Sequence, residues 1–262
     1  MKQSSLLSEI LVDILSERYF LPDDYAQTHK GKFENIETSL EELVRLYNEV
    51  ACKGFWEMQP EQGVEMTNKE FLRYALAQFG RDKELSKNID GFLKGRPFGS
   101  IPECGAHQWY VPIFYPSMVK NVHPYVENLY KELDRFDSFD EIFELVTLDK
   151  KKEKEKDKFR GYGPTCIYDT ILRMVYNRYG QDENHRLMPL RYVYLHSKPG
   201  KTLKLLNRKG LMNKAKYLII YSDVTDSKYV LGRAFAKYHM TSIDIENFLC
   251  IMNKPIENLL IQ

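Results

Sequence analysis

Apolar positions recur three and four residues apart through much of the chain, which is the spacing of helices that bury one face. Several such segments open with Ser or Thr followed three residues later by Glu, a pattern in which each side chain binds a backbone N–H of the other residue. The pattern predicts helices that begin at Ser39, Thr67 and Ser138, and a C-terminal helix capped by Thr241 or Ser242.

Two short segments have strand character instead. Residues 191–196 and 217–221 are rich in β-branched and aromatic side chains, as strands are. Short apolar runs also occur as turns of buried helix, so both interpretations stay open. We therefore predict a mainly α, multi-helix globular protein with a hairpin-like element and at most a few short strands.

Two stretches interrupt the helical pattern and suggest the domain organisation. Residues 91–116 are dense in Gly and Pro, which end helices and indicate a structured loop. Residues 149–158 read DKKKEKEKDK, a run typical of a solvated helix extension, a surface loop or a linker. We expect an N-terminal helical region over 1–148, a charged linker or surface loop over 149–158 and a C-terminal helical region over 159–262.

The segment after the charged run has the composition of a phosphate-binding turn. It reads FRGYGP over residues 159–164 and leads into a predicted helix that ends near Gly180. Gly161 and Gly163 permit backbone conformations closed to other residues, and Pro164 suits the first position of a helix. Such a turn presents N–H groups and the positive end of the helix dipole to an anion such as phosphate.

Residues 139–180 resemble the helix-hairpin-helix element of DNA-binding proteins. There an apolar residue precedes a Gly-apolar-Gly turn, and Phe159, Gly161, Tyr162 and Gly163 fill those places here. The resemblance implies that hairpin amides grip the phosphate backbone without reading bases. A tight helix–helix turn that needs glycine only for packing is the alternative interpretation.

Basic residues gather around this element. They are Lys154, Lys156, Lys158, Arg160, Arg173, Arg178, Arg186 and Arg191. Residues 201–209 then alternate Lys or Arg with Leu, which predicts an amphipathic helix whose outer face is basic, or simply a solvated one. The residues expected to contact nucleic acid are Arg160, Gly161, Tyr162, Gly163, Thr165, Arg173, Lys201 and Lys204.

The base-excision glycosylases of the helix-hairpin-helix superfamily are not matched in their catalytic residues. Their bifunctional members place a lysine nucleophile just inside the second helix, and they carry an aspartate after a downstream proline-containing stretch. Thr165 or Cys166 stands at the first position here and Arg191 at the second. Asp169 remains a catalytic candidate, although pairing with Arg173 at i+4 is the commoner outcome.

Charge and cysteine usage narrow the classes of function. The net charge is +1, so any nucleic-acid binding must come from a local patch. The four cysteines are far apart, so we expect no disulfide framework or zinc ribbon, and no cofactor. Cys104 and His107 form the nearest local pair for half a metal site or a cysteine nucleophile with its base, but neither use is predicted.

Residues 1–15 are apolar enough to suggest a signal peptide, but Glu9 and Asp13 interrupt the run. Their spacing is that of an amphipathic helix, and no run reaches the length of a membrane span. We therefore expect a cytoplasmic protein without a membrane partner.

The leading hypothesis is a nucleic-acid-binding protein that contacts the phosphate backbone of DNA through the Gly-Tyr-Gly hairpin and adjacent basic helices. One alternative is an enzyme, DNA glycosylase-like or another hydrolase, with a cleft lined by aromatic residues. That cleft would involve Tyr162, Tyr168, Asp169, Trp109 and Tyr110. Another alternative is a helical protein-interaction module, which a large exposed apolar patch would favour.

Overall fold

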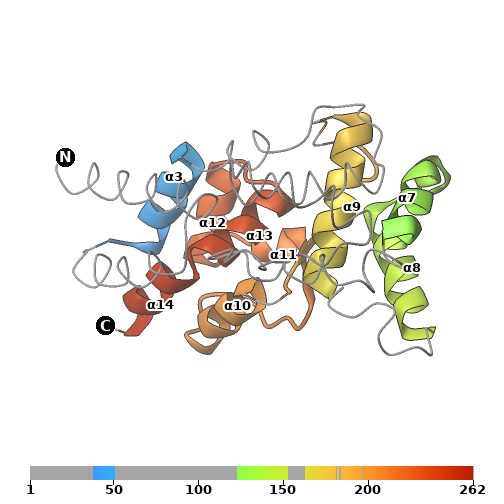
Figure 1. Cartoon of the computed structure of the whole chain (residues 1–262). Coiled ribbons are helices and arrows are strands. Elements are labelled where there is room, and N and C mark those ends of the chain that lie inside the picture. Colours follow the sequence, from blue (N-terminus) through green and yellow to red (C-terminus); the bar gives the residue numbers. More distant parts are fainter. Residues whose placement is uncertain are drawn as a thin grey trace, which may run out of the picture. The chain divides into compact units, whose positions relative to one another are not determined.

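The computed structural model of the chain describes residues 38–50, 123–152, 163–180, 182, 184–196 and 198–261. These residues form a mainly helical structure with a two-stranded antiparallel sheet (Figure 1). The mainly α fold class predicted from the sequence is therefore confirmed. Within this part of the chain, no helix is both long and apolar enough to cross a membrane. The expected helices at residues 1–15 and at Thr67, and the loop at 91–116, lie outside the described residues.

The described elements follow one another as helices with two short strands between them. In chain order they are α3 (Leu40–Val50), α7 (His123–Lys131), the 3-10 helix η4 (Leu133–Arg135), α8 (Phe139–Lys152), α9 (Pro164–Tyr179), β1 (Tyr192–Tyr194), α10 (Lys198–Arg208), β2 (Leu218–Ile220), α11 (Tyr221–Val224), α12 (Val230–Lys237), α13 (Ser242–Ile251) and α14 (Asn253–Ile261).

The capping residues predicted for α3 and α8 are in place, although the glutamates bind elsewhere. The Ser39 hydroxyl accepts the Glu42 N–H at 3.1 Å, and the Ser138 hydroxyl accepts the Glu141 N–H at 3.2 Å. The Glu42 carboxylate pairs with Arg45 instead of completing the box. One capping side chain is thus enough to start each helix.

Both ends of α9 and the start of α13 lie where the sequence predicted them. Pro164 is the first residue of α9, and Gly180 ends the helix with a φ of 81°, a left-handed conformation that favours glycine. At α13 the full reciprocal box forms between Thr241 and Asp244. Thr241, rather than Ser242, is therefore the capping residue.

The two segments of strand character pair with each other. β1 and β2 run antiparallel with Val193 opposite Ile219, and both of these side chains are buried. The ladder continues past the strand ends, because the Leu195 N–H donates to the Tyr217 carbonyl at 2.8 Å. The strand interpretation of residues 191–196 and 217–221 is thus correct at their centres.

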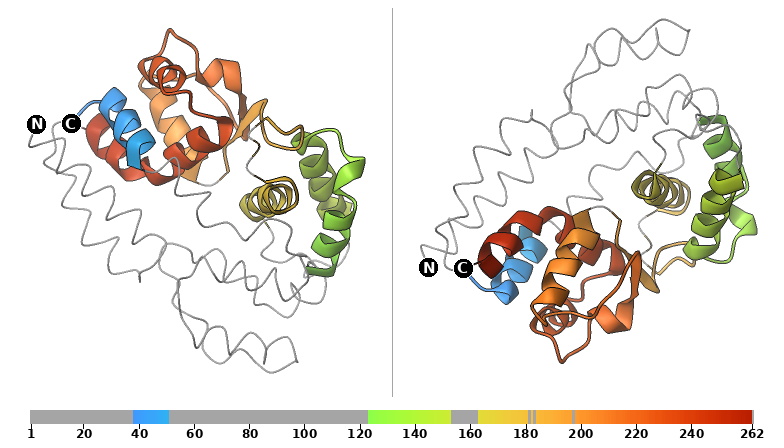
Figure 2. Two further views of the ribbon diagram at one scale, coloured as in Figure 1. Left: turned by 90° about the horizontal axis from the view of Figure 1, so that it is seen from above. Right: turned by 90° about the horizontal axis from the view of Figure 1, so that it is seen from below.

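The described residues belong to two compact units. The first unit holds 38–50 and 189–261, and the second holds 123–152 and 163–188. This grouping differs from a division at 149–158, because α8 and α9, on either side of that stretch, pack against each other (Figure 2).

The first unit joins α3 to the C-terminal helices around one aromatic centre. The Phe248 ring lies edge-on to Tyr47 of α3 and to Phe235 of α12, with ring centroids 5.4 Å apart in both pairs. α3 packs on α12, while α10 packs on α13 and α14. Burial of these apolar faces is the main stabilising contribution.

The second unit is built on α8 and α9. Every apolar residue predicted for the inner face of α9 is buried: Ile167, Ile171, Leu172, Met174 and Val175. Phe139 of α8 lies against Tyr168 of α9 with ring centroids 5.5 Å apart. The predicted amphipathic pattern of α9 is therefore confirmed.

Candidate nucleic-acid interface

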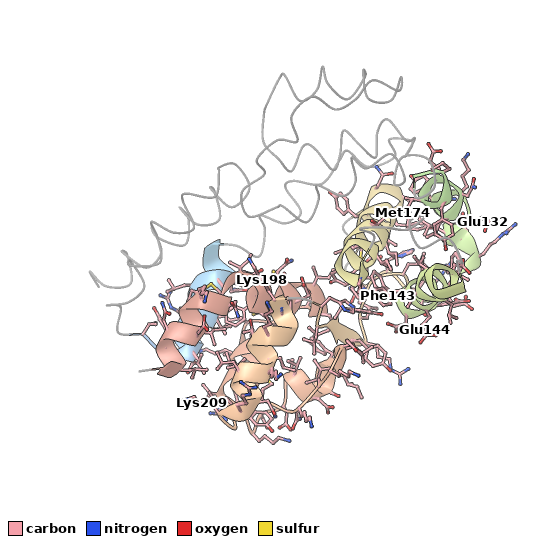
Figure 3. The ribbon with its side chains drawn as sticks, turned by 60° about the horizontal axis from the view of Figure 1, so that its bottom comes forward. Glu132, Phe143, Glu144, Met174, Lys198 and Lys209 are labelled. Atoms are coloured by element: carbon pink, nitrogen blue, oxygen red, sulfur yellow. The ribbon has the colours of Figure 1, made fainter. Side chains whose placement is uncertain are left out.

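Helix α10, in the first unit, presents a basic outer face. Its buried positions are Pro199, Thr202, Leu203 and Leu206. Its exposed positions include Lys201, Lys204 and Arg208, and the exposed Lys209 follows directly. Figure 3 shows Lys198 and Lys209 at the two ends of this helix. The amphipathic helix predicted over 201–209 is thus confirmed.

Buried polar contacts fix the inner side of α10. The Thr202 side chain is fully buried, and its hydroxyl lies 2.6 Å from the Leu249 carbonyl, to which it donates. The same oxygen accepts a hydrogen bond from the Asn253 amide at 2.9 Å. At the first turn of α10, a Cβ on Gly200 would lie 2.5 Å from the Leu195 carbonyl. Glycine therefore lets the first turn of α10 approach the backbone of Leu195 closely, just after β1.

A glycine in the left-handed conformation ends α10 and turns the chain. Gly210 has a φ of 70°, and its N–H donates to Asn207 at 2.9 Å. The Leu211 N–H donates to the Leu206 carbonyl, also at 2.9 Å. These are the two hydrogen bonds of a Schellman motif. The chain then continues through two exposed lysines, Lys214 and Lys216.

All the Lys, Arg, Asp and Glu residues in the sequence around α10 are basic ones. Residues 189–222 contain eight Lys or Arg and no Asp or Glu, whereas the rest of the chain has thirty Lys and Arg against 37 Asp and Glu in total. This segment therefore stands out from a chain whose net charge is only +1. A local surplus of this kind attracts polyanions even when the whole protein is nearly neutral.

Carboxylates do not neutralise this face within the described residues. Six exposed cations there form no ion pair with a described carboxylate: Lys201, Lys204, Arg208, Lys209, Lys214 and Lys216. Elsewhere in the first unit, by contrast, Lys228 pairs with Asp226 and Lys237 pairs with Glu41. These six cations thus stay available to an external anion.

The sequence interpretation missed three residues of this surface: Lys214, Lys216 and Tyr217. They follow the segment 201–209, whose helical spacing of basic and apolar residues was the pattern that predicted the basic helix. A count of acidic residues over 189–222 would have found them, because their common property is the absence of neighbouring negative charge.

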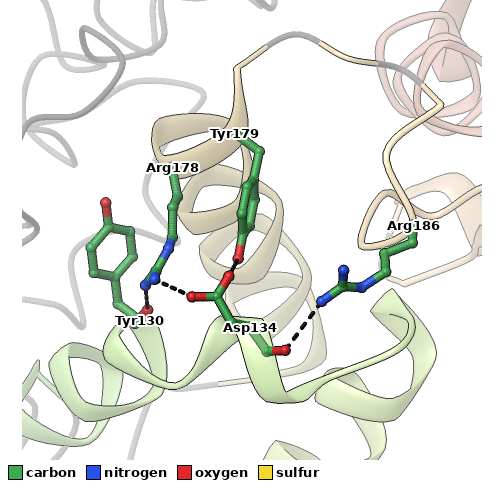
Figure 4. A network of polar contacts seen from close by, with 5 residues as sticks. All are labelled: Tyr130, Asp134, Arg178, Tyr179 and Arg186. Atoms are coloured by element: carbon green, nitrogen blue, oxygen red, sulfur yellow. Dashed lines mark hydrogen bonds and ion pairs between the residues drawn. The ribbon is translucent and has the colours of Figure 1, made fainter.

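Arg178, by contrast, is occupied within the second unit (Figure 4). Its guanidinium pairs with the Asp134 carboxylate and donates to the Tyr130 carbonyl at 2.7 Å. The Tyr179 hydroxyl donates to the other Asp134 oxygen at 2.5 Å. These contacts join the last turn of α9 to η4 and α7.

Arg186 has a similar internal role. It donates to the carbonyls of Phe136 and Asp134, both at 3.1 Å. Grouping Arg178 and Arg186 with a phosphate-binding patch is therefore wrong, because protein acceptors already engage both guanidinium groups. Arg191 differs, since it is exposed and its guanidinium carbon lies 5.2 Å from the centre of the Tyr192 ring.

The electrostatics of the Asp134 network are those of a structural contact. The hydrogen bond from Tyr179, together with Arg178 and Arg186, holds the pKa of Asp134 below its usual value. Burial and the hydrogen bond to Asp134 raise the pKa of Tyr179 to about 12. Near neutral pH the carboxylate is ionised and the phenol protonated, so the pair is not poised for proton transfer.

The predicted hairpin is described only from Gly163 onward. Gly163 precedes α9 with φ −83° and ψ 176°, and a Cβ there would meet nothing within 4 Å. The expectation that Gly163 uses a conformation closed to other residues is therefore wrong. Arg160, Gly161 and Tyr162 lie outside the described residues, as do the side chains of Thr165, Asp169 and Arg173.

None of the described residues is in a position that supports the enzyme alternative. Tyr168, expected to line a cleft, is 3% exposed and packs against Phe139 in the core of the second unit. Trp109 and Tyr110, together with Cys104 and His107, are outside the described residues. Among the side chains that the structure places, no group of three or more His, Cys, Asp or Glu could hold a metal ion.

Comparisons of the chain with protein-family models, with curated proteins and with solved structures found no match. The functional conclusion accordingly rests on the charge and geometry of the described residues.

Proposed function

We propose that this protein binds nucleic acid through the phosphate backbone, with the outer face of α10 and residues 209–216 as its main contact surface. One observation carries the proposal: residues 189–222 hold eight cations and no acidic residue, and seven of those cations are exposed without a described ion-pair partner. Lysine and arginine on such a face replace the counterions that surround phosphates, which supplies most non-specific affinity.

The arrangement of the cations suits a polymer better than a small anion. Lys201 and Arg208 are seven residues apart on α10, which corresponds to about 10 Å along the helix axis. Lys214 and Lys216 add two exposed cations in the segment that returns from α10 to Tyr217, which pairs with Leu195. A single phosphate would need cations that converge on one point, whereas a row of cations matches a row of phosphates.

We propose that the Gly161–Gly163 turn makes a second contact to the phosphate backbone of the nucleic acid. α9 begins directly after Gly163, and the first N–H groups of a helix have no partner within the helix. Those groups and the helix dipole favour a phosphate.

The test is binding of fluorescently labelled DNA and RNA across a salt series from about 50 to about 200 mM, where phosphate-dominated binding weakens steeply. The double variant Lys201→Glu/Lys204→Glu should weaken binding and reduce the slope of log K against log salt by about two. Both side chains are exposed, so circular dichroism should show an unchanged fold.

Arg135→Glu is the matched control, because it changes the charge in the same way on an exposed side chain of the second unit. It should leave binding and the salt slope close to those of the original protein. Absence of any salt-sensitive binding to DNA or RNA, or equal losses in the control and the double variant, would refute the proposal.

A further inference from the structure

The sheet beside α10 leaves one of its faces partly open. Strand alternation places Val193 and Ile219 on one face, and Tyr192, Tyr194, Leu218 and Ile220 on the other, where Tyr194 is buried. Leu218 is 42% exposed and Ile220 is 43% exposed. These two side chains form a short exposed apolar strip on β2.

An exposed tyrosine adjoins this face. Tyr217 directly precedes β2, and 59% of its side chain is exposed. In the register of the sheet, Tyr192 lies opposite Ile220, so Tyr192 and Tyr217 are three residue levels apart, or about 10 Å along the strands. Because this number of levels is odd, the two rings lie on opposite faces, Tyr192 beside Ile220 and Tyr217 at the start of β2.

Each of these tyrosines has a cation beside its ring. The Lys216 ammonium lies 4.7 Å from the centre of the Tyr217 ring, and the Arg191 guanidinium lies 5.2 Å from that of Tyr192. Both basic residues are exposed and belong to the segment that lacks acidic residues. Each of the two rings thus has a potential phosphate-binding group beside it.

We infer that the exposed surface around β2, defined by Tyr192, Tyr217, Leu218 and Ile220, binds the bases of single-stranded nucleic acid while the neighbouring cations bind its phosphates. This inference rests on the proposed function and specifies its substrate class. Aromatic rings within a basic surface are the usual means of holding a single strand, because unpaired bases stack on them. Bases inside a duplex are already stacked and cannot reach the rings.

Two other partners would use the surface differently. A membrane-surface protein needs a helix whose apolar face enters the lipid, but the apolar face of α10 is buried in the core. A protein partner would need acidic groups to match eight cations. A single strand supplies both the negative charge and the flat apolar groups, so the chemistry of the surface favours it.

The test compares the full chain on labelled oligothymidine, on oligouridine and on a duplex, each of about 20 nucleotides or base pairs, a length that spans a typical single-strand site. Both single strands should bind at least several-fold more tightly than the duplex. Tyr217→Ala should weaken single-strand binding by roughly 5- to 100-fold, the value of one stacked base, and leave duplex binding unchanged. Tyr217→Phe, which keeps the ring, should retain single-strand affinity.

Tyr238→Ala is the control, since Lys237 and the half-buried Tyr238 form a similar pair at the end of α12, with the ammonium 5.3 Å from the ring, but Lys237 is already paired with Glu41. This variant should leave single-strand affinity unchanged. Vesicles of phosphatidylcholine with phosphatidylserine serve as the lipid arm, and they should bind more weakly than oligothymidine.

The outcomes separate this inference from the proposed function. Equal affinity for single strands and duplex, with Tyr217→Ala unchanged on both, overturns the single-strand inference and leaves backbone binding standing. Binding to the anionic vesicles without binding to any nucleic acid overturns both.

Discussion

The Thr202 hydroxyl donates a hydrogen bond to the Leu249 carbonyl at 2.6 Å, and both residues are fully buried. This bond joins α10 to α13. The Thr202 oxygen also accepts a hydrogen bond from the Asn253 amide of α14. Because buried polar groups are costly when they lose their partners, the contact fixes which face of α10 turns inward. The outward direction of the basic residues depends on it.

Thr202→Val should therefore lower the free energy of unfolding by about 1–3 kcal/mol, because it leaves the Leu249 carbonyl and the Asn253 amide unsatisfied in the core. Urea denaturation measures the loss. Thr225→Val is the matched control, since the Thr225 hydroxyl bonds only to Tyr221 four residues earlier. Equal losses in the two variants would contradict the special role of the buried contact.

Gly210→Ala should lower the free energy of unfolding by about 1 kcal/mol, the cost of a left-handed conformation for a residue with a Cβ. No atom lies within 4 Å of that Cβ, so the conformation alone produces the loss. Gly210→Asn should lose less, because asparagine tolerates this region. Thermal denaturation of the three proteins checks the order, and a Gly210→Asn less stable than Gly210→Ala would contradict it.

Gly163→Asp should stabilise α9 by about 0.3 kcal/mol, because the new carboxylate accepts one of the first N–H groups of the helix and is a slightly better cap than glycine. The same carboxylate would repel a phosphate, so duplex binding should weaken by roughly 5-fold if the hairpin contacts the backbone. Denaturation and anisotropy on the same samples separate the two effects. The neutral cap Gly163→Asn should stabilise α9 with a smaller loss of binding. A more stable Gly163→Asp protein with unchanged affinity would exclude this end of α9 from the interface.

Arg178→Met should loosen the end of α9 and lower stability by about 1 kcal/mol, since it removes a hydrogen bond to the Tyr130 carbonyl and an ion pair with Asp134. The salt dependence of nucleic-acid binding should stay as it is, because Arg178 is engaged within the second unit. A reduced salt slope would show instead that its guanidinium contacts phosphate.

Stability should fall as the pH drops from about 6.5 towards 4, because burial lowers the pKa of His196 from 6.5 to about 4. Between these values the unfolded chain binds a proton that the folded protein does not, so acid favours unfolding. Burial and Arg186 also lower the pKa of His185, in the same direction. His196→Gln should flatten the dependence in denaturation at pH 7 and pH 5. His239→Asn is the control, because His239 is exposed and asparagine tolerates its φ of 51°. This variant should not flatten the pH dependence of stability.

Local signals in the sequence predicted the parts of the structure that local forces determine. Pro164 and Gly180 mark the ends of α9, and the spacing of leucines predicted which face of α10 is buried. Strands of three residues are harder, because an apolar run that short fits a helix turn equally well. The antiparallel pairing of β1 with β2 shows that both segments are strands.

Contacts between distant residues could not be predicted in this way. Arg178 and Asp134 are 44 residues apart in sequence, and no periodic pattern connects them. Their pairing removes Arg178 from the set of available cations, which charge counting along the chain cannot detect. Tyr217 was missed for a related reason, since its exposure follows from packing and not from its type.

Because α3 packs against helices near the other end of the sequence, it is synthesised on the ribosome well before its packing partners. Glu41 of α3 pairs with Lys237, 196 residues later, and Tyr47 needs the Phe248 ring to be covered. At a usual rate of translation, α3 waits about 10 to 40 seconds for these partners to emerge. Until then its apolar face lacks the native cover that α12 and α13 give, which leaves it open to non-native contacts.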